Sequence, residues 1–141
     1  MPKAEALHIY TDGAARGNPG PAAIAFIIED HKGVVLKKYS ESIGIATNNT
    51  AEYVAIIKAL EEASGYCRKD VFCFCDSRLV VNQLNGVYKI KKKHLKEKFL
   101  EAKAREKMFE KVAYRHVPRT HPKIKIADEL VNEELDKVKN S

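Results

Sequence analysis

The first third of the chain alternates short apolar runs with turns rich in glycine, proline and asparagine. This spacing is typical of β-strands joined by tight turns. We expect strands at residues 5–11, 22–29 and 34–43, with a glycine- and proline-rich turn at 13–21 and a second turn at 30–33. Because consecutive strands with short connections usually pair side by side, these strands are predicted to form an antiparallel meander.

From residue 48 the apolar positions recur three and four residues apart, which is the period of an amphipathic helix. We expect a helix from Asn48, with Asn or Thr available as N-cap, to near Gly65. An apolar strand at 71–75, a helix from Ser77 to Asn85, a basic helix at 95–108, a strand at 112–117 and a last helix at about 126–138 follow. This order predicts an α/β fold whose five-stranded mixed sheet has three antiparallel strands followed by parallel ones, flanked by helices.

The composition indicates one globular domain over residues 1–141, with 45% hydrophobic and 31% charged residues. Cys67, Cys73 and Cys75 form no even disulfide framework and are interpreted as core residues rather than zinc ligands. No apolar run is long enough to cross a membrane and no signal-peptide pattern is present, which predicts a cytoplasmic protein. A monomer is expected, because no exposed apolar heptad stands out.

The chain carries a net charge of +6, which favours a polyanionic partner. Residues 89–107 contain nine Lys or Arg against three Glu. Two interpretations of this basic segment remain open, a solvated helix face and a surface that contacts phosphate.

Acidic residues stand at the ends of predicted elements. Asp12 closes the first strand, Glu52 lies in the first turn of its helix, Asp76 closes the fourth strand, and Asp128 lies in the first turns of the last helix. If the first and fourth strands are adjacent and parallel, Asp12 and Asp76 emerge side by side at the sheet edge where α/β proteins bind ligands. Crowded carboxylates need a cation, and oxygen-only ligands suit Mg²⁺ or Mn²⁺. Two such ions about 4 Å apart can hydrolyse a phosphodiester.

Four motifs surround these carboxylates. They are Tyr-Thr-Asp-Gly-Ala with Gly-Asn-Pro-Gly (residues 10–20), Thr-Asn-Asn-Thr-Ala-Glu-Tyr (47–53), Cys-Asp-Ser (75–77) and Ala-Asp-Glu-Leu (127–130). In this order they resemble the motifs of type 1 ribonuclease H, the nuclease that cuts the RNA strand of RNA–DNA hybrids. The resemblance covers nearly the whole chain. It implies a ribonuclease H-like fold and catalysis with two Mg²⁺ or Mn²⁺ ions on Asp12, Glu52, Asp76 and Asp128, leaving 5′-phosphate and 3′-hydroxyl ends.

The resemblance also implies substrate contacts. Gly13, Ala15 and Asn18, with Asn48 and Asn49, match positions that line the minor groove near RNA 2′-hydroxyls, where short amides and bare backbone suit a shallow groove. Thr47 matches a position that holds a DNA phosphate, and Arg78 lies where it could face the groove. For each of these residues, ordinary turn, cap or helix-surface chemistry remains an alternative.

Two departures from the family pattern affect the expected site. The chain has no Trp and only a short segment at 86–95, so it resembles the branch that lacks the basic protrusion. Lys89, Lys91, Lys92 and Lys93 are expected to supply part of that phosphate contact.

In the late loop, Val-Pro-Arg (117–119) resembles the protrusion-less branch, whereas the His-Pro pair at 121–122 resembles the bacterial form. We therefore expect Arg119 first and His121 second to assist product release or proton transfer. His116 is interpreted as structural. An Asn that relatives carry before the fourth Asp is replaced near Ile124.

The alternatives to a hybrid nuclease are a non-catalytic module that binds hybrids or double-stranded RNA, and another nuclease of the same superfold. The resemblance leaves double-stranded RNA open as an additional substrate.

Overall fold

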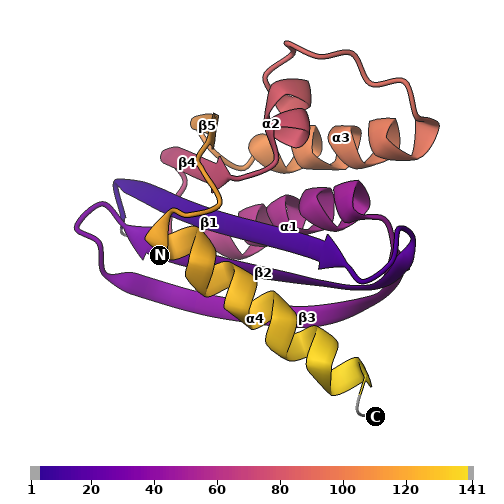
Figure 1. Ribbon diagram of the computed structural model, residues 1–141. Coiled ribbons are helices and arrows are strands. Elements are labelled where there is room, and N and C mark those ends of the chain that lie inside the picture. Colours follow the sequence, from indigo (N-terminus) through magenta and orange to yellow (C-terminus); the bar gives the residue numbers. More distant parts are fainter. Residues whose placement is uncertain (1–3, 140–141) are drawn as a thin grey trace.

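The computed structural model describes residues 4–139, which form one sheet and four helices (Figure 1). The strands are β1 (Ala6–Ala15), β2 (Gly20–Asp30), β3 (Val35–Ala46), β4 (Asp70–Cys75) and β5 (Lys111–His116). The helices are α1 (Asn48–Ala63), α2 (Arg78–Leu84), α3 (Lys93–Glu106) and α4 (Pro122–Lys139).

The strand order in the sheet is β3-β2-β1-β4-β5. β1, β2 and β3 pair antiparallel, whereas β4 pairs parallel with both β1 and β5. This confirms the predicted mixed sheet. Residues 22–29 of β2 are buried on both sides of the sheet, which explains their unbroken apolar run, whereas β3 is a partly exposed edge strand.

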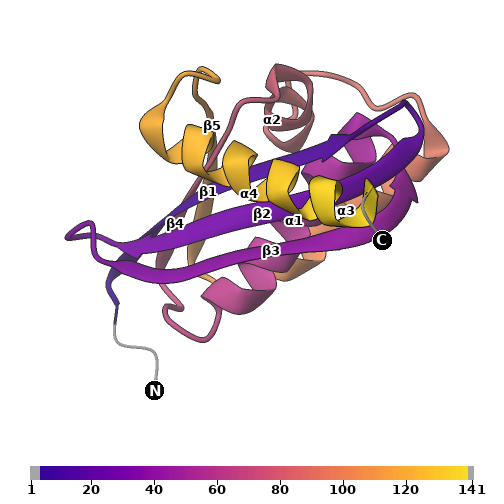
Figure 2. The ribbon, with the colours of Figure 1, turned by 60° about the horizontal axis from the view of Figure 1, so that its bottom comes forward.

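Helices cover both faces of the sheet. α4 crosses the face formed by β1, β2 and β3, while α1 packs on the opposite face with α3 stacked outside it (Figures 1 and 2). One core lies between the sheet and α1 with α3, and a smaller one lies beneath α4 around Ala25, Ile27, Ile124 and Val131. The sheet therefore separates two hydrophobic layers and leaves its strand ends free to hold a site.

Two predicted boundaries were wrong in ways that bear on the site. β1 continues to Ala15, so Asp12 does not close the strand. The reason is that the antiparallel hairpin with β2 extends to the pair Ala15–Ala22. α4 begins at Pro122 rather than near residue 126, because the backbone N–H of Lys123 donates to Nδ1 of His121 and caps the helix start (3.1 Å).

The three cysteines are buried and free, as predicted for core residues. Within residues 4–139, the helices are all too short or too polar to cross a bilayer.

Candidate active site

The first two carboxylates are brought together by the register of β1 and β4. Parallel pairing between these strands ends at Thr11–Cys75, so Asp12 and Asp76 are the residues that directly follow the last pair. Asp12 is only 6% exposed, and Asp76 is partly buried. The sequence predicts that Asp12 and Asp76 lie side by side, although it also predicts that the first strand ends at Asp12.

Glu52 joins them because β1 and α1 approach unusually closely at Gly13. A Cβ at Gly13 would lie 2.3 Å from the carbonyl oxygen of Ala51, so no larger residue fits there without moving the helix. The contact lets the Gly13 N–H donate to Oε1 of Glu52 at 2.8 Å. Gly13 therefore positions the glutamate that is buried beside Asp12.

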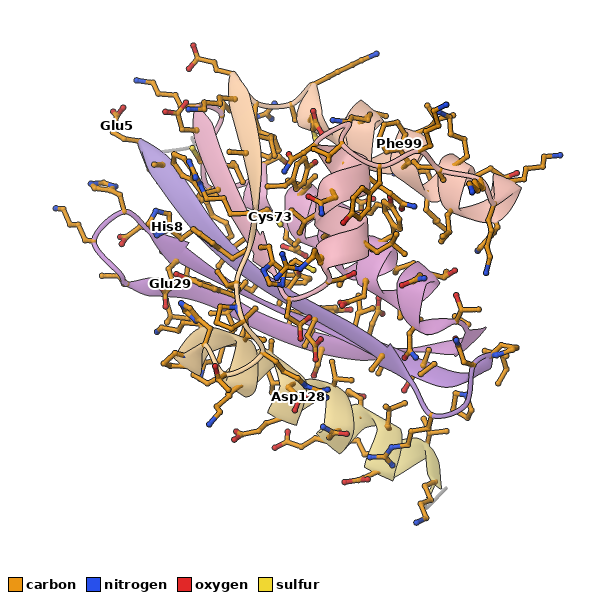
Figure 3. All side chains as sticks on the ribbon, turned by 45° about the horizontal axis from the view of Figure 1, so that its top comes forward. Glu5, His8, Glu29, Cys73, Phe99 and Asp128 are labelled. Carbon is orange, nitrogen blue, oxygen red and sulfur yellow. The ribbon has the colours of Figure 1, made fainter. Side chains whose placement is uncertain are left out.

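The fourth carboxylate comes from α4 on the other side of the sheet edge. Asp128, labelled in Figure 3, is the seventh residue of that helix, and its carboxylate interacts with Asp12. Nη2 of Arg119 lies 3.7 Å from Oδ1 of Asp128, and the Arg119 side chain is 79% exposed. A solvent-exposed cationic side chain therefore borders the cluster.

Burial and mutual repulsion shift the acidity of the two most enclosed carboxyls. Burial first, and then the Asp76 and Asp128 carboxylates, raise the pKa of Asp12 from 3.8 to about 7, although Arg119 opposes the rise. Burial, with the nearby Asp12 and Asp76 carboxylates, raises the pKa of Glu52 well above its ordinary value. The fold therefore holds negative charge here against an electrostatic cost.

The residues fit a divalent cation. Oδ2 of Asp12 is buried and has no hydrogen-bond partner in the described part of the chain. Ligand atoms of Glu52, Cys75 and Asp76 all lie within 4.8 Å of one another. Oxygen atoms from Asp12, Glu52, Asp76 and Asp128 are the donor type that Mg²⁺ and Mn²⁺ prefer.

A turn and a helix start border the cluster. The N–H of Ala15 donates to Oδ1 of Asn48 at 2.7 Å, and the N–H of Asn48 donates to Oδ1 of Asn18 at 3.0 Å. These bonds fix the β1–β2 turn, where Gly17 has a φ of +103°, against the start of α1. Among residues 4–139, no hydrogen bond involves the NH₂ group of Asn18 or Asn48. Both NH₂ groups are therefore available to a ligand.

Comparison with known proteins places this geometry in a family. A family model described as "Reverse transcriptase-like" matches residues 10–134. The ribonuclease HI of Halobacterium salinarum is 40% identical over 130 residues, which are 92% of this chain and 64% of that protein. The crystal structure of RNase H1 from the same archaeon superposes with a TM-score of 0.89 at 39% identity, covering 94% of this chain and 98% of that one.

This chain belongs to the type 1 ribonuclease H family. The structure of LC11-RNase H1 in complex with an RNA/DNA hybrid has a TM-score of 0.86 at 44% identity and covers 94% of this chain and 98% of that one. The chain spans 64% of the curated H. salinarum relative and 35% of a curated bifunctional Mycobacterium tuberculosis protein that it matches at 37% identity. The five-stranded sheet is thus the ribonuclease H fold, as the motifs implied.

The basic segment lies beside the family motifs rather than on a remote surface. Lys89, Lys91 and Lys92 line a groove of about 550 Å³ together with Asn49 and residues of α2 and α3. Lys93 begins α3 and Arg78 begins α2, and both are exposed. Thr47 is the N-cap of α1, with its Oγ1 accepting the N–H of Thr50 at 3.2 Å.

Arg119 and His121, the two residues of the late loop that were predicted to assist the reaction, make different contacts. Arg119 contacts Asp128, whereas His121 stacks on Tyr10 with ring centroids 5.2 Å apart and caps α4 through Nδ1. The geometry therefore favours Arg119. His116 is exposed at the end of β5, which does not support its interpretation as a structural histidine.

Sequence reasoning missed one member of the cluster. Cys75 was interpreted as a core residue, yet its Sγ lies within 4.8 Å of a carboxylate oxygen of both Glu52 and Asp76. The signal available was its position immediately before Asp76.

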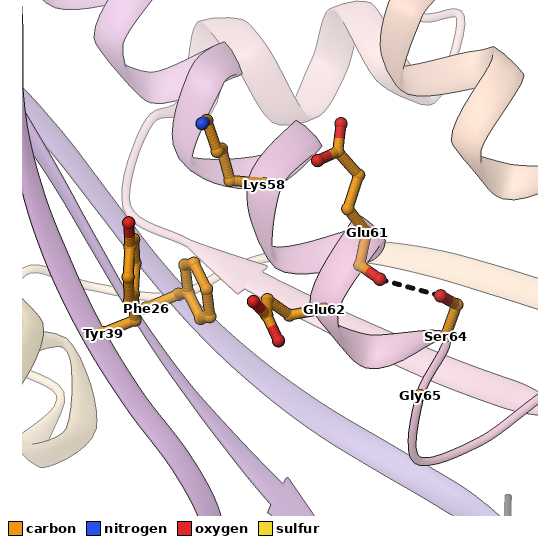
Figure 4. A pocket seen from close by; sticks show the side chains of 7 residues that line it. All are labelled: Phe26, Tyr39, Lys58, Glu61, Glu62, Ser64 and Gly65. Atoms are coloured by element: carbon orange, nitrogen blue, oxygen red, sulfur yellow. Dashed lines mark hydrogen bonds between the residues drawn. The ribbon is translucent and has the colours of Figure 1, made fainter. Parts of the chain in front are cut away.

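A separate hollow of about 370 Å³, between β3 and the end of α1, contains none of the predicted site residues (Figure 4).

Proposed function

We propose that this chain is a metal-dependent endonuclease that hydrolyses the RNA strand of RNA–DNA hybrids. The observation that carries the proposal is the convergence of Asp12, Glu52, Asp76 and Asp128 at the edge between β1 and β4. A relative of 44% identity has been solved with an RNA/DNA hybrid, which supports this substrate.

We infer that the four carboxylates hold two Mg²⁺ or Mn²⁺ ions. When bound, the ions supply the chemistry of phosphodiester hydrolysis, activating water and stabilising the leaving oxygen. The chain's own contribution is to preorganise the oxygen ligands. Gly13 fixes Glu52 through its N–H, and the strand register fixes Asp12 beside Asp76. The proposed products carry 5′-phosphate and 3′-hydroxyl ends.

Arg119 is the residue we assign to assistance beyond the carboxylates. Guanidinium groups do not serve as proton-transfer groups, but the exposed side chain of Arg119 can stabilise negative charge on a phosphate at the open side of the site. His121 is less suited to this role, because its Nδ1 and its ring face are already engaged in the fold.

Discrimination of RNA from DNA is assigned to the turn beside α1. The NH₂ groups of Asn18 and Asn48 and the short side chain of Ala15 suit contacts to 2′-hydroxyls in a wide, shallow groove. The groove lined by Asn49, Lys89, Lys91 and Lys92 is assigned to backbone phosphates, as are the exposed Lys93 and Arg78 and the hydroxyl of Thr47.

A non-catalytic binding module is the alternative of a different class. The raised pKa of Asp12 argues against it, because a protein that only binds a polyanion gains nothing from burying carboxylates next to phosphate. We also propose that the protein is a monomer and cytoplasmic. Double-stranded RNA is the second substrate to assay.

The decisive experiment is cleavage of an end-labelled RNA–DNA hybrid in Mg²⁺ or Mn²⁺ by the wild type, Asp76→Asn and Asp70→Asn. The last variant makes the same substitution at the opposite end of β4 and serves as the matched control. We expect internal cuts in the RNA strand that are lost in Asp76→Asn and kept in Asp70→Asn. Tight hybrid binding without cutting would favour the binding module. Equal cutting of single-stranded RNA would point to another nuclease.

A further inference from the structure

Cys75 is a buried thiol at the end of β4, immediately beside the carboxylate cluster. It is 1% exposed, and its Sγ accepts the backbone N–H of Ser77 at 3.4 Å. Cys73, labelled in Figure 3, lies two residues earlier on the same inward face of β4 and is equally buried. The two thiols share a strand and a face, but only Cys75 adjoins the acidic side chains.

The surroundings of Cys75 offer further donors for a cation. The Sγ atom and one carboxylate oxygen each from Glu52 and Asp76 lie within 4.8 Å of one another. Independently, Oδ2 of the nearby Asp12 is buried without a hydrogen-bond partner in the described chain, and its carboxylate interacts with both Glu52 and Asp76. A buried carboxylate oxygen without a partner, next to two further carboxylates, is the arrangement expected where a cation binds.

We propose that Glu52, Cys75 and Asp76 form a mixed thiolate–carboxylate site for a thiophilic divalent cation, Zn²⁺ or Cd²⁺, with Asp12 as the adjacent oxygen donor. The inhibitory consequence rests on the proposed function: a cation held by these residues occupies two of the carboxylates that the nuclease needs. Zn²⁺ therefore acts as an inhibitor that competes with Mg²⁺.

The distances suit such a cation. With Zn–S near 2.3 Å and Zn–O near 2.1 Å, sulfur and oxygen ligands on one tetrahedral ion lie about 3.6 Å apart. The side chains need to close by about 1 Å from their separation of up to 4.8 Å, which rotation of the partly buried Asp76 carboxylate can supply. As the metal–sulfur bond forms, the thiol proton leaves to solvent, so that a thiolate and two carboxylates surround the ion.

Ligand softness makes this site selective. Thiolate binds Zn²⁺ and Cd²⁺ strongly, whereas Mg²⁺ and Mn²⁺ favour oxygen. Replacing Cys75 should therefore weaken thiophilic ions and leave Mg²⁺ binding nearly unchanged. That contrast separates a ligand from a residue that merely shapes the core.

The test is a titration of the metal-free protein with Cd²⁺ in the absence of nucleic acid, followed by the ultraviolet thiolate-to-cadmium charge-transfer band and by calorimetry. Wild type, Cys75→Ser and the matched control Cys73→Ser are compared. We expect one equivalent of Cd²⁺ with the band in wild type and in Cys73→Ser. In Cys75→Ser the band should vanish, and the Cd²⁺ affinity should fall at least as much as the roughly 10- to 100-fold that loss of an outer-shell partner costs.

Absence of the band in wild type overturns the proposal without any variant, as does a band that survives in Cys75→Ser or disappears equally in Cys73→Ser. Hybrid cleavage in Mg²⁺ is measured separately. A Cys75-dependent band without cleavage supports the thiol site and refutes only the nuclease, whereas cleavage without the band overturns the thiol site. With both present, Zn²⁺ should inhibit Cys75→Ser less strongly than wild type by the same factor as the affinity loss.

Discussion

The electrostatic cost of the carboxylate cluster predicts that removing one of its charges stabilises the metal-free protein. Asp12→Asn keeps the size and shape of the side chain and removes the charge. The folded protein raises the pKa of Asp12 from 3.8 to about 7, so it binds that proton more tightly than the unfolded chain does. The contribution of Asp12 to the free energy of unfolding is therefore most favourable below pH 4. It decreases as the pH rises from about 4 to about 7, because the folded protein then loses the proton that it binds more tightly.

The magnitude follows from that interval. At 1.36 kcal/mol for each pKa unit, a rise from 3.8 to about 7 corresponds to about 4 kcal/mol above pH 7. Part of this repulsion would be relieved by proton uptake on Glu52 or Asp76, so we expect Asp12→Asn to gain about 2–4 kcal/mol at pH 8. For a domain of this length the gain should raise Tm by about 6–12 °C.

Thermal and urea unfolding in the presence of a chelator, at pH 5 and pH 8, would measure this effect. At pH 5 the gap between variant and wild type should shrink to less than half, because folded Asp12 is then mostly protonated. Asp70→Asn is the matched control and should change stability by no more than about 0.5 kcal/mol. A variant no more stable than wild type at pH 8, or a gap independent of pH, would refute the argument that the cluster stores repulsion.

Three further outcomes are expected. In urea unfolding, Gly13→Ala should destabilise the fold by about 2–3 kcal/mol, because its Cβ would lie 2.3 Å from the carbonyl oxygen of Ala51. The control Gly65→Ala should be nearly neutral, because its nearest contact would be at 3.4 Å. Arg119→Ala should lower kcat on hybrids about tenfold with little change in KM, whereas His121→Ala should mainly lower Tm. Equal losses of kcat in the two variants would contradict the assignment of Arg119. Replacing both Lys91 and Lys92 by Glu should weaken hybrid binding and reduce the slope of log affinity against log salt concentration by about one unit for each lysine. An unchanged slope would place the phosphate contact elsewhere. The same conclusion would follow if the control Lys32→Glu, in the β2–β3 turn, had an equal effect.

The sequence predicted the sheet because its strands carry clear signals. The unbroken apolar run of β2 and the glycine-rich turns around it indicate a meander, and the short apolar run from Val71 to Cys75 favours a buried strand by its length. Adjacency of β1 and β4 then brings Asp12 beside Asp76, as expected.

The errors arose where tertiary contacts override local pattern. A glycine-rich segment is locally indistinguishable from a turn, yet Gly13 lies inside β1 because the hairpin with β2 continues to Ala15. The start of α4 depends on a side-chain cap from His121, a residue considered at first for its chemistry alone. Cys75 resembles a core residue by alternation, and only the fold shows that the core at this point borders the site.

The location of the site also follows from topology without any motif. From β1 the chain turns to β2 on one side of the sheet, whereas from β4 it crosses through α2 and α3 to β5 on the other side. β1 and β4 are therefore neighbours whose connections leave in opposite directions, and such a switch point opens a crevice at the carboxyl ends of the strands. Asp12 and Asp76 lie at that crevice, and α1 and α4 close on it from opposite faces with Glu52 and Asp128. Any reaction that this chain catalyses should therefore take place between β1 and β4, whichever nucleic acid proves to be the substrate.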